Sequence, residues 1–185
     1  MLFNELSEDR KLEEIEKCRN DESYLDYDWW NFCDEDFKTI LELLGFYRIN
    51  TFFSGFWSQG DGASFTARYS NEKRITTKIK SYAPLDLELH RIAKGIQDIQ
   101  QSCKYEFVGS IYCTGNYSHS HTMRFETEDY NNPKIDEYED DFLQLCRDLA
   151  DWYYEKLEQE WDFLNSDEAI SEHLNSNEYD FEDEE

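Results

Sequence analysis

The chain has few basic residues for its length. Its 185 residues include 18 Lys and Arg against 43 Asp and Glu, which gives a formal net charge of −25 at pH 7. Charge of this sign repels nucleic acids and anionic membranes and attracts basic proteins. The composition therefore argues against direct nucleic-acid binding and membrane contact, and it favours a basic protein partner.

Paired cysteines and long apolar runs are also missing. No apolar run approaches the roughly 18 residues of a membrane span, and no stretch has the pattern of a signal peptide. The absence of a CxxC pair argues against a zinc ribbon and a redox dithiol. We therefore expect a soluble cytoplasmic protein with free thiols. Its five cysteines are Cys18, Cys33, Cys103, Cys113 and Cys146.

Common catalytic and nucleotide-binding motifs are absent as well. The sequence contains no Walker loop, no GxGxxG, no GxSxG and no HExxH. None of the cysteines can be paired with a base to make a nucleophile. The sequence thus predicts a protein that is not an enzyme, with no catalytic residue, no cofactor and no metal.

Aromatic residues, in contrast, are abundant. They make up 17% of the chain, whereas hydrophobic residues as a whole make up only 39%. Each buried ring removes roughly 150–250 Å² from water, so a modest number of rings can hold a domain of this size. Several aromatic residues cluster within residues 24–32, and such a cluster is compatible with a homodimer interface.

The negative charge is concentrated at the two ends of the sequence. The net charge is −9 over residues 1–45, +2 over residues 46–135 and −18 over residues 136–185. We expect a single α+β domain over residues 1–175, in which two acidic helical flanks (1–45 and 136–175) enclose a hairpin-helix-hairpin centre (46–135). Residues 176–185 read as a mobile acidic tail.

Periodicity and turn signals predict the elements of this domain. Helices are expected over residues 5–19, 34–44, 86–102 and 136–164, with Asp34 as the N-cap of the second. Strands are expected over residues 47–57, 63–70, 105–113 and 118–127, with a further short strand over 75–80. The fold class is therefore α+β, an antiparallel sheet of two β-hairpins packed with helices. Residues 56–61 and 111–116 share a weak sequence similarity, which predicts that the two hairpins pair through their first strands.

Two stretches of the centre resemble a known group of proteins. FSGFWSQGDGASF (residues 53–65) and YCTGNYSHSHTM (residues 112–123) are similar to a family of small phage and prophage proteins, often labelled antitoxins of a toxin–antitoxin system. The resemblance spans about residues 45–125. It implies a phage setting, a bacterial host cell and a host-directed or regulatory role, and it carries no reaction.

The tips of the two hairpins hold residues that could line a pocket. If His119 and His121 lie on one strand, their side chains point to the same face. One hypothesis is a small-molecule or metal-binding hydrolase that uses the SQGDG turn, with zinc held by Cys113 and both histidines as a weaker variant. The alternative is that Asp61 shapes a turn and the histidines lie on a polar sheet face. The candidate pocket residues are Trp57, Gln59, Asp61, Tyr117, His119 and His121.

The long C-terminal helix carries a row of acidic residues at three- and four-residue steps. At a rise of about 1.5 Å per residue, such steps place carboxylates roughly 5 Å apart along one face. We expect this row to bind the basic nucleic-acid groove of a host defence complex, as an anti-CRISPR or anti-restriction mimic of nucleic acid. An antitoxin that neutralises a basic toxin, or a plain solvated face, remains an alternative. The residues are Glu137, Asp141, Asp148, Asp151, Glu155, Glu158 and Asp162, helped by Asp34, Glu35 and Asp36.

Overall fold

The computed structural model describes residues 1–21, 23–25, 28–128, 133–177, 179 and 181, with the backbone alone for residues 133–136. Two compact units are present: the larger is Phe32–Lys156, and the smaller combines Met1–Asn31 with Leu157–Glu185. These boundaries differ from those that the charge distribution indicated. Among the described residues, no helix has both the length and the apolar composition of a membrane span.

An antiparallel four-stranded sheet forms the centre of the larger unit, as the α+β prediction required. The strand order is β1-β2-β3-β4. The two hairpins are confirmed, but they join through β2 and β3 rather than through their first strands. At β1 the register shifts between Tyr47 and Asn50, where Arg48 has a φ of 54°. The strands are β1 (Phe46–Phe53), β2 (Ala63–Tyr69), β3 (Gly109–Cys113) and β4 (Met123–Thr127).

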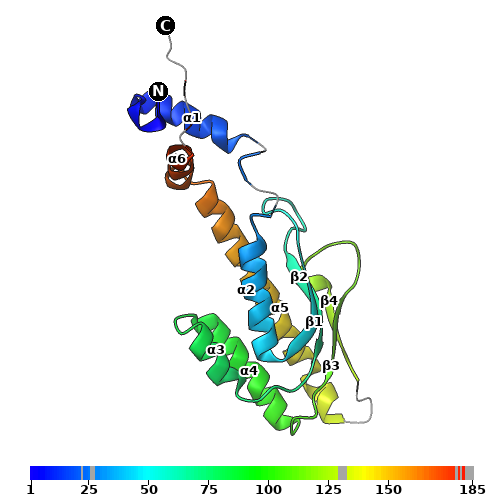
Figure 1. Cartoon of the computed structure of the whole chain (residues 1–185). Coiled ribbons are helices and arrows are strands. Elements are labelled where there is room, and N and C mark those ends of the chain that lie inside the picture. Colours follow the sequence, from blue (N-terminus) through cyan, green and yellow to red (C-terminus); the bar gives the residue numbers. More distant parts are fainter. Residues whose placement is uncertain (22, 26–27, 129–132, 178, 180, 182–185) are drawn as a thin grey trace. The chain divides into compact units, whose positions relative to one another are not determined.

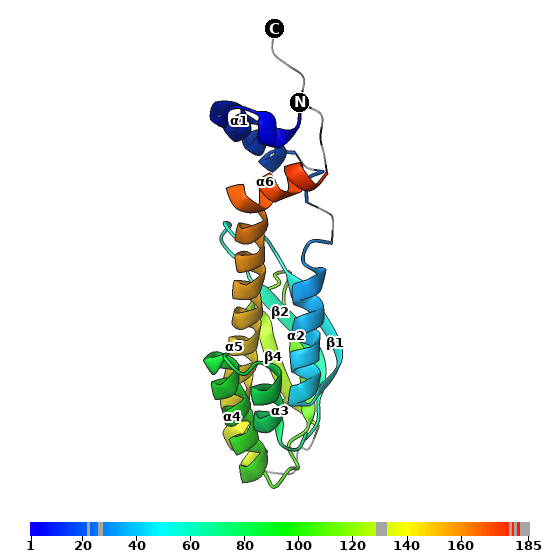
Figure 2. The same cartoon turned by 60° about the vertical axis from the view of Figure 1, so that its left-hand side comes forward.

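Helices α2 and α5 lie side by side on one face of this sheet (Figures 1 and 2). The core between them and the sheet is aromatic, as the composition predicted. Phe37 of α2 stacks on Tyr153 of α5 with ring centroids 4.3 Å apart. Phe142 of α5 contacts the rings of Phe46, Tyr69, Phe107 and Phe125. The helices of this unit are α2 (Asn31–Leu44), α3 (Ile75–Tyr82), α4 (Leu87–Ser102) and α5 (Pro133–Leu164), which continues into the smaller unit.

Three local predictions are wrong, each for a physical reason. Residues 75–80 form α3 instead of a strand, because Ile75 and Ile79 are one helical turn apart and both are buried. Helix α2 begins at Asn31, so Asp34 lies inside it and is not its N-cap. His119 is the N-cap of a 3-10 turn, η2 (Ser120–Thr122), and His121 lies within this turn, so the two histidines are not on a strand.

The smaller unit has its own apolar core. It contains η1 (Phe3–Glu5), α1 (Glu8–Arg19), the end of α5 and α6 (Asp167–Ser176). Part of the expected mobile tail is docked here, since the Phe181 N–H donates to the Met1 carbonyl at 2.9 Å. Residues 178, 180 and 182–185 lie outside the described part of the chain. The core residues are Phe3, Leu6, Ile15, Ile170 and Leu174.

Candidate functional site

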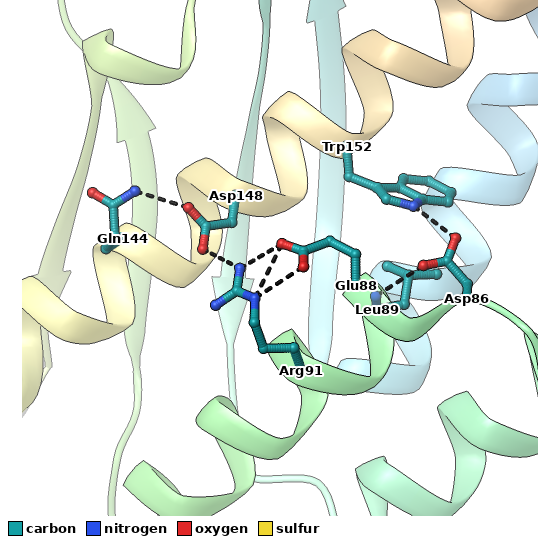
Figure 3. A network of polar contacts seen from close by, with 7 residues as sticks. All are labelled: Asp86, Glu88, Leu89, Arg91, Gln144, Asp148 and Trp152. Atoms are coloured by element: carbon teal, nitrogen blue, oxygen red, sulfur yellow. Dashed lines mark hydrogen bonds and ion pairs between the residues drawn. The ribbon is translucent and has the colours of Figure 1, made fainter.

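Helices α4 and α5 run antiparallel and pack closely in the larger unit. Gly95 makes the close approach, because a Cβ at this position would lie 2.9 Å from Cδ1 of Leu145. One carboxylate fixes the N-terminal end of α4. Asp86 accepts from the Leu89 N–H at 3.0 Å through Oδ1 and from the Trp152 indole N–H at 2.9 Å through Oδ2 (Figure 3). Asp86 is thus the N-cap of α4, and the helix expected over residues 86–102 is confirmed.

An ion-pair network bridges the two helices one turn further along α4. The Arg91 guanidinium donates to Glu88 of its own helix and to Asp148 of α5 (Figure 3). Gln144 donates to the other oxygen of Asp148 at 2.8 Å. The hydrogen bonds that Arg91 donates to Glu88, and to a lesser extent to Asp148, raise the pKa of Arg91, so the guanidinium is firmly held as a cation.

Two depressions follow the α4–α5 seam, and they share Arg91 and Asp148. One has a volume of about 400 Å³ and includes Gly95, Ile99 and Leu145 in its lining, and the other has a volume of about 410 Å³. Together their linings contain one cation, Arg91, and six carboxylates, so the seam is strongly negative. The carboxylates are Glu88, Asp98, Asp141, Asp148, Asp151 and Glu155.

The predicted acidic row on α5 is divided by the structure. The Asp148 carboxylate accepts hydrogen bonds from Arg91 and Gln144. Glu158 and Asp162 belong to the smaller unit. The remaining four carboxylates are exposed, and they form neither a hydrogen bond nor an ion pair with any described residue. These four are Glu137, Asp141, Asp151 and Glu155.

The acidic triplet at the start of α2 is largely structural. Asp34 is only 4% exposed and accepts from Lys38 Nζ at 2.6 Å, from the Thr51 hydroxyl and from the Tyr153 hydroxyl at 3.2 Å. The prediction that Asp34 binds a partner is therefore wrong, because a buried carboxylate needs its donors inside the fold. Burial, reinforced by the Asp34 charge, raises the pKa of Tyr153.

The two other members of this triplet differ from Asp34. Asp36 accepts a hydrogen bond from the Tyr82 hydroxyl at 2.5 Å, and this bond raises the pKa of Tyr82. Glu35 is exposed. Of the three carboxylates, Glu35 is the one that the structure leaves open to a partner.

The structure brings the tips of the two hairpins together. A Cβ at Gly60 would lie 3.5 Å from the Tyr117 ring, and one at Gly62 would lie 3.0 Å from the His119 ring. Glycine is required at residue 60 in any case, because its φ is +94°. The tips therefore pack through glycines against rings, which explains the two Gly residues of the SQGDG turn.

The chemistry of these tips is that of a turn. The Asp61 carboxylate accepts from the Ser58 N–H at 2.6 Å and, within the described residues, bonds to neither histidine. The rings of His119 and His121 stack at 4.9 Å, and Nδ1 of His119 accepts from the His121 N–H at 3.1 Å. Gln59 is exposed, and Trp57 is 74% exposed. The pairing of Asp61 with a histidine, which a hydrolase would need, is not formed in this arrangement.

Metal binding finds no support among the described residues. No group of three or more His, Cys, Asp and Glu side chains there could hold an ion. This includes the combination of Cys113, His119 and His121. The Cys113 thiol instead lies 3.7 Å from the Phe65 carbonyl oxygen.

The fold is thus α+β, with an acidic helical seam on its larger unit. Residues 29–167 match the family described as Domain of unknown function (DUF8835), and the chain belongs to this family. The matched segment contains the α4–α5 seam and both hairpin tips. No curated protein and no solved structure matches the chain.

Sequence reasoning missed two residues that shape the seam. Gly95 interrupts a helical pattern, and such a glycine often marks close packing, so a signal was present. Arg91 follows Glu88 by three residues, which indicates a local ion pair. Its second partner, Asp148, is distant in the sequence and gave no local signal.

Proposed function

We propose that this protein is a non-catalytic acidic binding protein that competes with nucleic acid for the basic groove of a partner protein. The observation that carries this proposal is the set of exposed, unpaired carboxylates on α5, of which Asp141, Asp151 and Glu155 also line the α4–α5 seam. A partner that presents Arg and Lys would supply the compensating charge that the chain itself does not provide there.

The two basic residues of this part of α5 do not relieve the repulsion. Arg147 donates to the Met123 carbonyl at 3.2 Å, and Lys156 lies over the Trp152 ring at 5.3 Å. A solvated helix face is usually stabilised by i,i+4 pairs of opposite charge, and like charges at that spacing cost about 0.2–0.5 kcal/mol per pair. Asp151 and Glu155 have this like-charge spacing, which supports a role outside folding.

The partner class follows from the charge and from the resemblance to phage proteins. A groove that holds phosphates with Arg and Lys would accept carboxylates in their place. A host defence complex, such as a CRISPR effector or a restriction enzyme, has this kind of groove. An antitoxin that neutralises a basic toxin would use the same face, so the two functions differ in partner and not in surface.

A capture experiment with a matched control tests this proposal. The full chain, the double variant Asp151→Asn/Glu155→Gln and the control Glu42→Gln/Glu106→Gln are immobilised and exposed to host lysate at low and high salt. Both variants lose two negative charges, but Glu42 and Glu106 are exposed elsewhere on the larger unit. We expect wild type and control to retain a nucleic-acid-binding protein that salt releases and that the seam variant fails to hold.

The retained protein is then purified and its complex is challenged with its own nucleic acid. Displacement by nucleic acid supports competition for the groove. Retention of the same protein by the seam variant, or a complex indifferent to nucleic acid, would contradict the proposal. A retained protein that is a toxin without nucleic-acid binding would instead establish the antitoxin alternative.

A further inference from the structure

A second candidate site lies in the smaller unit, separate from the acidic seam. It is a pocket of about 440 Å³ between the end of α5, the helix α6 and the residues Tyr24, Leu25 and Trp29. Its lining combines ring systems with carboxylates, and it includes no Lys or Arg. The residues that matter for its chemistry are Tyr24, Trp29, Phe163, His173, Glu160 and Glu172.

The rings of this pocket are held in place by the fold. The Tyr24 hydroxyl donates to the Leu164 carbonyl at 2.7 Å, and the Tyr24 ring meets the His173 ring edge-on at 5.0 Å. Trp29 packs against Trp161 with centroids 5.3 Å apart. The pocket is therefore formed before any ligand arrives, which lowers the entropic cost of binding.

Two carboxylates and one ring of the lining remain open to a ligand. Glu160 and Glu172 form neither an ion pair nor a hydrogen bond with any described residue. Phe163 is 60% exposed, so its ring is largely uncovered. An exposed ring beside unpaired carboxylates offers two kinds of attraction to the same ligand.

We propose that this pocket binds an organic cation, either a guanidinium or an alkylammonium group. Such a cation is attracted by the faces of Trp, Tyr and Phe rings and by carboxylates, and its carbon atoms suit an aromatic wall. An anion would be repelled by the two carboxylates and would find no Lys or Arg in the lining. A hard metal ion such as Ca²⁺ needs six or more oxygen ligands, which two carboxylates and a wall of rings do not supply. A neutral apolar ligand would bury the two carboxylates without compensation.

This site is independent of the proposed function on α5. Glu160 and Glu172 are not members of the acidic row, and the pocket lies wholly within the smaller unit. The cation has two sources, an arginine side chain of a protein or a free diamine. The two sources share the chemistry of recognition, and the experiment separates them.

Nuclear magnetic resonance of the full chain tests the proposal through its tryptophan indole signals. The chain has five Trp residues, and the signal of Trp29 is assigned with the variant Trp29→Phe. The probes are N-acetyl-arginine amide and putrescine, with N-acetyl-citrulline amide as a neutral analogue of the first. We expect a saturable shift of the Trp29 signal with at least one cation and none with the citrulline derivative. The cation that binds more tightly identifies the source.

Matched variants then separate the pocket from general attraction to an acidic protein. Phe163→Leu keeps the apolar bulk but removes the ring face, and it should weaken cation binding roughly fivefold. Glu160→Gln should weaken binding by a similar factor, whereas Asp162→Asn should not, because Asp162 is exposed outside the lining.

Three results would overturn the proposal. The first is the absence of a saturable shift with either cation. The second is equal binding of the citrulline derivative. The third is an equal loss in Asp162→Asn and Glu160→Gln, which would show that only the overall charge attracts the probe.

Discussion

Two groups of carboxylates on the larger unit differ in how the fold uses them. Asp34 is buried and receives hydrogen bonds from Lys38, Thr51 and Tyr153. Asp151 and Glu155 are exposed, and the part of the chain that the structure describes offers them no partner. The first group holds α2, β1 and α5 together, whereas the second contributes nothing to folding that the structure can identify. The comparison teaches that burial separates the carboxylate that holds the fold together from those that the fold does not use.

The largest expected effect is that of Asp34→Ala. It removes the acceptor of the buried Tyr153 hydroxyl and of the half-buried Thr51 hydroxyl, and we expect it to lower the free energy of unfolding by about 3 kcal/mol. The measurement is urea denaturation at neutral pH. The matched control is Glu35→Gln, the next residue on the same helix, which should change stability by less than about 0.5 kcal/mol because Glu35 is exposed. Equal effects of the two variants would erase the distinction between the groups.

The next effect concerns a donor to Asp34 and appears at alkaline pH. The pKa of Tyr153 is raised above its ordinary value of 10.0 by burial and by Asp34, so the unfolded chain loses this proton first. The stability from Tyr153 is therefore complete below about pH 10 and is lost as pH rises further, by up to about 1.4 kcal/mol per pH unit. Tyr153→Phe should cost about 1 kcal/mol at pH 8 and flatten this alkaline decline.

Urea denaturation between pH 8 and pH 11 measures that slope. Tyr69→Phe serves as a comparison, since burial also raises the pKa of Tyr69 and its removal should flatten the curve as well. A decline as steep in Tyr153→Phe as in the wild type would show that this hydroxyl does not stay protonated in the folded state.

An intermediate effect is expected from Asp148, which shares features of both groups. Its side chain is 21% exposed and paired with Arg91, whose side chain is 51% exposed. Solvent weakens such a pair, so Asp148→Asn should cost about 0.5–1 kcal/mol. A double-mutant cycle with Arg91→Gln measures the coupling energy, which should be of the same size. A coupling near zero would place Asp148 with the exposed carboxylates.

Much of the fold could be predicted because its signals are local. The Gly-containing turns mark both hairpins, and the apolar stripe after Asp86 marks α4 with its cap. The failures are of two kinds. Threonines beside Ile75 and Ile79 favoured a strand, although the spacing of the two isoleucines fits a helix. The pairing of β2 with β3 depends on packing between distant segments, which no local pattern reports.

The candidate site follows the same division. The acidic row on α5 is periodic in the sequence, so its one-sided character could be predicted. The ion pair of Asp148 with Arg91 and the burial of Asp34 could not be predicted, because each depends on a residue from another element. Charge alone does not tell whether a carboxylate faces water or a hydroxyl of the core.

The smallest effect on stability is expected where the effect on binding is largest. Asp151→Asn/Glu155→Gln removes a like-charge pair one helical turn apart, so the free energy of unfolding should stay equal or rise by a few tenths of a kcal/mol. The gain should shrink at high salt, because about 0.15 M salt already screens exposed charges beyond roughly 8 Å. Urea denaturation at two salt concentrations, beside Glu42→Gln/Glu106→Gln, measures it. A loss above about 1 kcal/mol would mean that these carboxylates hold the fold as Asp34 does, and the proposed binding face would lose its basis. Unchanged stability combined with lost partner binding is the result that only a functional surface produces.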